Sequence, residues 1–301
     1  MRIDQLPRSE NVEDRRGSGG FRIPGGRGGG IGILGFILLT LVAWWMGVDP
    51  SVLIGGADIL TGGRQQEQPQ QAPGKTEASM PDEIKDRVSA ILGSTEKVWS
   101  DIFQKSGRRY EPPTLVMFDG ATRSGCGVAQ SAMGPFYCPL DQKVYLDTSF
   151  FRDLERRFRA CDAGSKACQF SQAYVITHEV GHHVQNLLGI LPRVQQMQQR
   201  MDTQTDANAL QVRVELQADC LAGVWANHAE KEWQFMDEGD VEAAMQTASA
   251  IGDDRLQKQT QGYVVPDAFT HGSAQQRTRW LMTGLKSGNP DSCNTYESER
   301  I

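Results

Sequence analysis

The sequence predicts a mainly helical α+β domain with a small sheet, placed behind one N-terminal transmembrane helix. Three patterns support this prediction: a long uncharged apolar run near the start, short strand-like segments before residue 150, and helical periodicity beyond it. With 39% hydrophobic residues in 301, the chain has enough apolar surface to bury an ordinary core. The helical segments expected in the second half are residues 170–188, 192–201, 205–233, 239–259 and 274–285.

The first eighty residues divide into three segments. Residues 1–30 are rich in Gly and Arg, and no Gly-Lys-Ser/Thr follows the glycines, which argues against a phosphate-binding loop. Residues 31–48 carry no charge over eighteen positions, which is close to the length of a transmembrane helix. Residues 49–79 are rich in Gln, Pro and Gly and predict a flexible linker. The folded domain is therefore expected at residues 80–301.

The charges before the apolar run predict its orientation. Residues 1–30 contain six arginines and four acidic residues, and the positive-inside rule gives the acids little weight. We expect the N-terminus in the cytoplasm, one crossing of the cytoplasmic (inner) membrane, and a periplasmic or otherwise extracytoplasmic domain. A cleaved signal peptide and a buried core helix are the alternatives. Against the signal peptide, the run ends in bulky Trp44 and Trp45 instead of a small-residue cleavage site.

All six cysteines follow the apolar run, and an even number in an extracytoplasmic domain favours disulfides over buried free thiols. Close spacing favours Cys126 with Cys138 and Cys161 with Cys168, which leaves Cys220 for Cys293, although six cysteines allow fifteen pairings.

The start of the domain predicts one helix and a few strands. Apolar residues recur at helical spacing from Pro81 to Gln104, after an acidic first turn. Pro113–Asp119 and Lys143–Phe150 read as strands, and the Gly- and Cys-bearing segment between them predicts a hairpin.

Residues 175–185, VITHEVGHHVQ, combine His178, Glu179 and His182 in an apolar helical segment. Residues four apart share one helix face, so the two imidazoles can hold one divalent cation while Glu179 flanks them as a general base. Gly181 lowers helix stability by about 1 kcal/mol relative to Ala, which a close-packed neighbour would explain. His183 points away and is read as an ordinary histidine without a role at the metal.

A catalytic zinc ion needs a third protein ligand. Residues 212–223 are helical and place Glu215 and Asp219 four apart on one face. Glu215 is the expected third ligand, and Asp219 is expected to accept the other N–H of a ligand histidine. The longer H-E-x-x-H-x-x-G-x-x-H pattern fails, because Gln185 and Leu188 occupy its last two positions.

These motifs, together with GPFYCPLDQKVYLD upstream and HGSAQQRTRW downstream, resemble the bacterial putative neutral zinc metallopeptidase family over about residues 80–295. The resemblance implies a zincin-like fold, in which a small sheet lies beside the active-site helix and a second helix brings Glu215 to a cleft. It also implies bound Zn²⁺ and a peptide or protein substrate.

Hydrolysis also needs a group that stabilises the tetrahedral intermediate. His271 is the candidate, because the capping box of Ser273 and Gln276 places it in the loop just before a helix. Tyr263 and Tyr137 are the alternatives.

The function expected from the sequence is a membrane-anchored zinc endopeptidase with Glu179 as the general base. A zinc-stabilised extracytoplasmic binding or adaptor domain without turnover is the alternative. The net charge of −6 and the mixing of charges along the chain argue against a nucleic-acid partner. The oligomeric state is not predicted.

Overall fold

The computed structural model describes residues 1–17, 82–156 and 166–298. These residues form eight α-helices and two small sheets, which confirms the mainly helical α+β prediction. The predicted transmembrane helix at 31–48 and the linker at 49–79 lie outside the described residues. Among the helices of the described part, none is long and apolar enough to span a membrane.

The larger sheet has the strand order β1-β2-β6-β5. β2 runs parallel to both β1 and β6, and β5 is an antiparallel edge strand on β6. β3 and β4 form a separate antiparallel hairpin, which confirms the hairpin predicted between the two main strands. The strands are β1 (Val12–Asp14), β2 (Thr114–Phe118), β3 (Ala121–Ser124), β4 (Gly127–Gln130), β5 (Phe136–Cys138) and β6 (Lys143–Asp147).

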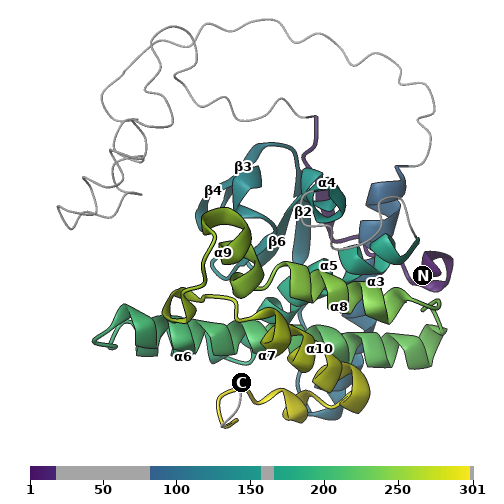
Figure 1. Ribbon diagram of the computed structural model, residues 1–301. Helices are drawn as coiled ribbons and strands as arrows, with labels where there is room; N and C mark the ends of the chain where they lie inside the picture. Colours follow the sequence, from purple (N-terminus) through teal and green to yellow (C-terminus); the bar gives the residue numbers. More distant parts are fainter. Residues whose placement is uncertain (18–81, 157–165, 299–301) are drawn as a thin grey trace, which may run out of the picture. The chain divides into compact units, whose positions relative to one another are not determined.

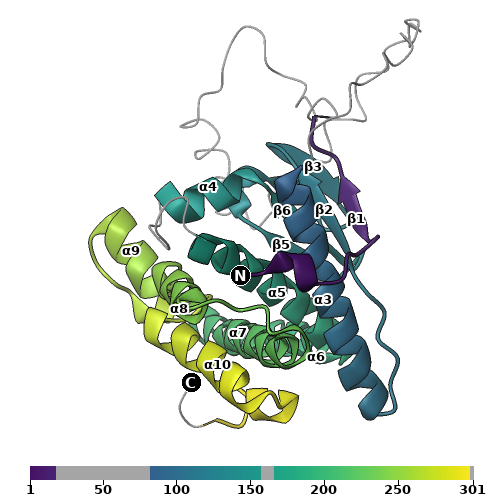
Figure 2. The same cartoon turned by 90° about the vertical axis from the view of Figure 1, so that its right-hand side faces the viewer.

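The helices stack in layers beside this sheet (Figure 1 and Figure 2). α5 lies between the sheet and α7, and α10 packs on α7 from the other side. The helices are α3 (Glu83–Lys105), α4 (Ser149–Arg156), α5 (Lys166–Leu187), α6 (Ile190–Gln198), α7 (Gln204–Trp233), α8 (Asp240–Ala250), α9 (Asp253–Gln261) and α10 (Ala274–Ser287). The stack places α5 and α7, which carry the two predicted ligand motifs, face to face.

Several predicted boundaries differ from the structure by a few residues, and two of the differences have a clear structural cause. The helix expected at 239–259 is divided into α8 and α9 at Gly252, where an added Cβ would lie 2.4 Å from the backbone nitrogen of Ala274. The strand expected to reach Phe150 ends at Asp147, whose carboxylate accepts the backbone N–H of Ser149 at the start of α4. In both places a contact outside the local periodic pattern ends the element.

The N-terminal segment belongs to the folded unit, although the sequence assigned residues 1–30 to a separate lead. Val12 of β1 pairs in register with Leu115 of β2. Arg8 donates two hydrogen bonds of 2.8 Å to the carboxylate of Asp86 on α3. An added Cβ at Gly93 of α3 would lie 2.5 Å from the carbonyl oxygen of Pro7, so this glycine lets the segment pack directly on the helix. For residues 1–17 the expected separation is therefore corrected.

Small residues allow α7 to approach both of its neighbours closely. An added Cβ at Gly181 of α5 would lie 3.0 Å from the carbonyl oxygen of Ala218 on α7, which is the close-packed neighbour expected from the sequence. On the opposite side, an added Cβ at Gly284 of α10 would overlap the carbonyl oxygen of Cys220 at 1.8 Å. At these glycines the backbone of α7 is in direct contact with the backbones of α5 and α10, close to the two ligand motifs.

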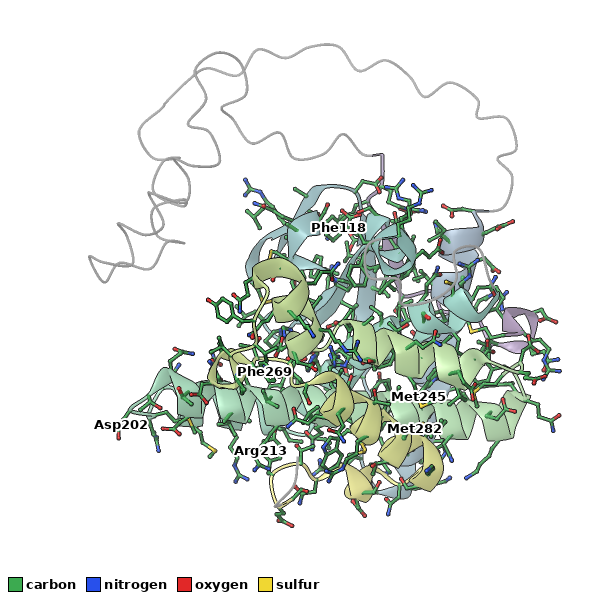
Figure 3. All side chains as sticks on the ribbon, viewed as in Figure 1. Phe118, Asp202, Arg213, Met245, Phe269 and Met282 are labelled. Carbon is green, nitrogen blue, oxygen red and sulfur yellow. A yellow bond between two sulfur atoms is a disulfide. The ribbon has the colours of Figure 1, made fainter. Side chains whose placement is uncertain are left out.

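Apolar side chains fill the spaces between these layers. The main cluster joins the sheet to α3, α5, α7 and α10, with the indole of Trp225 fully buried. A smaller cluster around Phe118, labelled in Figure 3, lies between the sheet and the hairpin.

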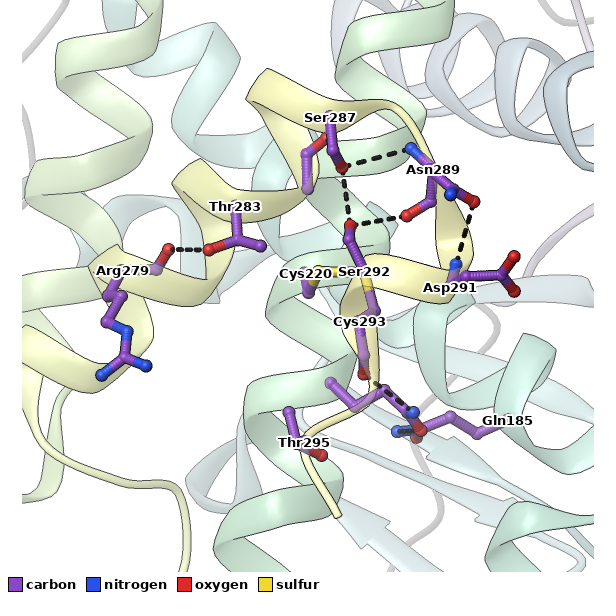
Figure 4. Close-up of a disulfide and its surroundings, with 12 residues drawn as sticks. Gln185, Cys220, Arg279, Thr283, Ser287, Asn289, Asp291, Ser292, Cys293 and Thr295 are labelled. Carbon is purple, nitrogen blue, oxygen red and sulfur yellow. Dashed lines mark hydrogen bonds between the residues drawn. A yellow bond between two sulfur atoms is a disulfide. The ribbon is translucent and has the colours of Figure 1, made fainter. Parts of the chain in front are cut away.

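The disulfides Cys126–Cys138 and Cys220–Cys293 are both present as predicted, and the second is drawn in Figure 4. Cys161 lies outside the described residues, so its pairing with Cys168 stays a prediction.

Candidate metal centre

His178, His182 and Glu215 meet where α5 faces α7. Glu215 Oε2 lies 3.2 Å from His178 Nε2 and 3.4 Å from His182 Nε2. One nitrogen or oxygen from each residue lies within 4.8 Å of the others, and this is a group that could hold a metal ion. The arrangement arises because the two histidines are one turn apart on α5 and α7 crosses directly over them at Gly181.

The donor set fits zinc in chemistry and in spacing. Two imidazoles and one carboxylate are an established ligand set for catalytic zinc. Ligands about 2.0–2.1 Å from a tetrahedral zinc ion lie about 3.3–3.4 Å from each other, which is close to the two separations from Glu215. The other carboxylate oxygen of Glu215 accepts a hydrogen bond of 2.9 Å from Gln211, which orients the group.

Asp219 binds the back of the His178 ring. Its Oδ1 lies 2.8 Å from Nδ1 of His178 and accepts a hydrogen bond of 2.6 Å from the hydroxyl of Tyr174. Arg277 of α10 donates to both carboxylate oxygens of Asp219, at 2.9 and 3.0 Å. The three partners are buried together with Asp219. Hydrogen bonds are stronger in the low dielectric of the protein interior, so this network holds the His178 ring in one orientation.

The charges of this network shift the pKa values of its members. Burial opposes ionisation of Asp219, but Arg277 and His178 outweigh burial and lower its pKa to about 2. Burial also opposes protonation of His178, but Asp219 and Glu215 outweigh it and raise the pKa of His178 to about 10. The pKa of Glu215 is held well below its usual value by the two histidines, against the effect of burial. A cation at His178 Nε2 therefore has to displace a proton.

Glu179 and the three candidate ligands line one cavity of about 870 Å³. Its walls come from the segment around β5 and from α5, α6, α7 and α9, and the volume is in the range of ligand-binding cavities. Glu179 is buried, at 7% exposure, and is not a member of the ligand group. Glu179 therefore lines the same cavity as the candidate ligands without being one of them.

His271 lines this cavity from the loop that precedes α10. Its Nδ1 lies 3.3 Å from Oδ1 of Asp253 and 3.0 Å from the hydroxyl of Thr270. Oδ2 of Asp253 also accepts the backbone N–H groups of Thr270, His271 and Gly272. Because Asp253 begins α9, the break between α8 and α9 is what brings a carboxylate to this loop. Nε2 is the nitrogen of His271 left for the cavity.

The two tyrosine alternatives occupy different surroundings. Tyr263 is 62% exposed and is not among the residues that line the cavity. Tyr137 of β5 lines it, but its hydroxyl lies 3.0 Å from Nδ1 of His183 and accepts a hydrogen bond from Asn186. Nε2 of His183 donates to the carbonyl of Glu111, so its Nδ1 is the acceptor of the Tyr137 hydroxyl hydrogen. His183 is fully buried and outside the candidate ligand group, which agrees with its expected lack of a role at the metal.

Three participants were not predicted as part of the site. These are Arg277, Tyr174 and Asp253, and the sequence marks none of them as a candidate site residue. Arg277 stands four residues after the cap Ser273, in the stretch that supports the family resemblance, and that position was the one available signal. The capping box of Ser273 and Gln276 itself is confirmed.

Comparison with known proteins gives one family model and several relatives. The sequence model of the family described as "Putative neutral zinc metallopeptidase" matches residues 1–296. The chain is 47% identical to "Uncharacterized protein YpfJ" of Escherichia coli K12, over 98% of this chain and 99% of that protein. It is 42% identical to "Uncharacterized protein Rv2575" of Mycobacterium tuberculosis H37Rv and to "Uncharacterized protein Mb2605" of Mycobacterium bovis, over 70% of each chain.

No solved structure matches the chain. The family match covers nearly the whole sequence, including the β1 segment and both ligand motifs. The chain therefore belongs to the putative neutral zinc metallopeptidase family.

Proposed function

We propose that this protein is a zinc-dependent endopeptidase, in which His178, His182 and Glu215 hold the metal ion. One observation carries the proposal: two imidazoles and a carboxylate converge at zinc-like spacing on the wall of a cavity that also contains Glu179 and His271. When bound, zinc acts as a Lewis acid toward a carbonyl group and lowers the pKa of a coordinated water to about 7. A structural zinc site usually fills its fourth position with protein, whereas among the residues that the structure describes this group consists of three.

The chain's own residues supply the proton transfers and the charge stabilisation. Glu179 is placed to accept a proton from the attacking water and to pass it to the departing amine. His271, oriented by Asp253, is placed to donate from Nε2 to the oxygen that becomes negative as the carbonyl is attacked. Asp219 and Arg277 keep the His178 ring in one orientation.

The cavity opening suggests which peptides bind. Met133 and Leu140 line the cavity and are 60% and 78% exposed, so they offer apolar surface at the same cavity as the candidate metal position. Exposed apolar groups at a cavity are typical of a binding surface. We therefore propose unfolded or flexible polypeptides with apolar side chains as the substrate class.

The proposal is tested by zinc content and cleavage of a mixed peptide library by the whole protein. We expect one zinc ion per chain, cleavage next to apolar residues, loss of cleavage with a chelator and recovery on addition of zinc. One bound zinc without cleavage of any peptide would favour the adaptor function instead. A chain that binds no zinc would contradict both.

The cellular location is also a proposal, and β1 constrains it. β1 and β2 are neighbours in one sheet, so residues 12–14 and 114–118 have to lie in the same compartment. A single crossing by residues 31–48 would separate them. We therefore propose that the apolar run attaches an extracytoplasmic domain to the membrane, with residues 1–17 on the same side as that domain. The disulfides are consistent with an oxidising compartment.

Cysteine labelling checks this arrangement. Glu10 is exposed in the N-terminal segment, and Arg109 is 89% exposed in its side chain after α3. We expect a membrane-impermeant maleimide to label Glu10→Cys and Arg109→Cys equally in intact spheroplasts, relative to the unsubstituted chain as background. Labelling of Arg109→Cys alone, with Glu10→Cys reached only after lysis, would support the single crossing and contradict the β1 pairing.

A further inference from the structure

A chain of buried amides starts at the second candidate ligand, His182. Oε1 of Gln185, one turn further along α5, lies 2.8 Å from Nδ1 of His182. The amide nitrogen of Gln185 donates to the carbonyl of Val214 at 2.8 Å and to Oε1 of Gln217 at 2.9 Å. Gln185 is fully buried and Gln217 is 7% exposed.

These bonds determine which nitrogen of His182 carries hydrogen. An amide nitrogen has two hydrogens, and the two acceptors on α7 use both of them. The oxygen of Gln185 is therefore the atom that faces His182 and has to accept a hydrogen bond, so Nδ1 is the protonated nitrogen. The lone pair of Nε2 is then left for the cation. If the Gln185 amide were reversed, two donors would meet and this arrangement would be lost.

The chain of amides continues to the second disulfide (Figure 4). The amide nitrogen of Gln217 donates to the carbonyl of Cys293 at 3.0 Å, which orients the Gln217 oxygen toward Gln185. Cys293 is bonded to Cys220, one turn further along α7 than Gln217. Both cysteines are at most 1% exposed. The disulfide therefore ties the Cys293 carbonyl, which accepts the Gln217 hydrogen bond, to α7, the helix that carries Gln217.

We propose that Gln185 is a positioning residue for the metal ligand His182, and that Gln217 and the Cys220–Cys293 disulfide hold Gln185 in the required orientation. The inference rests on the proposed zinc site and extends it to residues that touch neither metal nor substrate. His178 is oriented by an ionised network that ends on α10, and His182 by a neutral one that ends at Cys293. Each of the two ligands thus has its own support.

The test is zinc affinity, measured by competition with a chromogenic chelator on the whole protein. Gln185→Met keeps the volume of the side chain but removes the acceptor, and we expect zinc to bind about 10–100-fold more weakly. Gln196→Met, on the exposed face of α6, is the matched control and should bind zinc like the wild type. Wild-type affinity in Gln185→Met would overturn the proposal.

A second variant separates positioning from general stability. Gln185→Glu keeps an acceptor oxygen for His182 but loses the donors to Val214 and Gln217. We expect its midpoint of urea unfolding to fall while its zinc affinity stays within a few-fold of the wild type. If affinity instead falls together with stability in both variants, Gln185 is only a packing residue and the proposal fails.

Removing each disulfide in turn tests whether the Cys220–Cys293 bridge contributes to zinc affinity through Gln217 and Gln185. The double variant Cys220→Ala, Cys293→Ala should bind zinc more weakly than the wild type, although less so than Gln185→Met. Removal of Cys126 and Cys138 is the control and should leave zinc affinity unchanged. Wild-type affinity without the Cys220–Cys293 bridge would overturn the part of the proposal beyond Gln217. A wild type that binds zinc but cleaves no peptide would reject the hydrolysis and still leave the role of Gln185 to be decided by these affinities.

Discussion

Glu179→Gln is expected to lower kcat/KM for peptide cleavage by about 10²–10⁴-fold while leaving zinc affinity nearly unchanged. The amide has almost the shape of the carboxylate, so the buried site on α5 should keep its packing. It has no basic oxygen to accept a proton, and general-base catalysis is lost. Because Glu179 stands outside the ligand group, the metal should remain bound. Zinc stoichiometry and cleavage of a fluorogenic peptide, measured on the same sample, check both statements.

Glu232→Gln on the exposed end of α7 makes the same chemical change away from the cavity and should cleave like the wild type. Equal cleavage by Glu179→Gln and the wild type would reject Glu179 as the base. Loss of zinc together with activity would show instead that Glu179 belongs to the metal site. The two results are distinguishable because zinc content is read independently of turnover.

Arg277→Met is expected to reduce the free energy of unfolding by about 3–5 kcal/mol, since it removes one partner of a buried ion pair. The carboxylate of Asp219 is completely buried, and Arg277 is the cation that contacts both of its oxygens. Tyr174 and His178 would then be its remaining partners in the described network. At about 2–4 °C per kcal/mol for a domain of this size, the melting temperature should fall by about 6–20 °C. Urea unfolding and calorimetry measure the two quantities.

Arg200→Met, on the exposed turn after α6, is the matched control and should change the free energy of unfolding by less than about 0.5 kcal/mol. The double variant Arg277→Met, Asp219→Asn removes both charges, and we expect it to lose less stability than the sum of the two single variants. An Arg277→Met protein as stable as the wild type would contradict the assignment of this pair as a support of the site.

The residues of the candidate site that sequence predicts best are those related by helix geometry. His178 and His182 are four residues apart, as are Glu215 and Asp219, and such spacing fixes a shared face wherever the helix lies. The capping box before α10 and the β3–β4 hairpin are local in the same sense, because their residues are close together in the sequence. The partners of the site residues are different: Arg277 contacts Asp219, and Asp253 contacts His271, from segments far apart along the chain.

Long-range packing decided the rest. Gly252 breaks the predicted helix at 239–259 where α10 begins, and this break is what presents Asp253 to His271. The strand β1 was not predicted from the sequence, because it has only three residues, two of them acidic, and such a segment has little β-propensity without its neighbour β2. Gln185 counted in the sequence only as a departure from another zinc motif, yet its amide contacts His182.

By itself, the sequence determined the family, the mainly helical class, the candidate ligands and the two cysteine pairs that the structure describes. Only the tertiary structure decided that α7 crosses α5 at Gly181, that Arg277 and Gln185 orient the two histidines, and that the N-terminal segment joins the sheet. The physical reason is that the periodicity of apolar residues shows which face of a helix is buried. It does not show what covers that face, because this depends on how closely two backbones can approach at single glycines and on residues from distant segments of the chain.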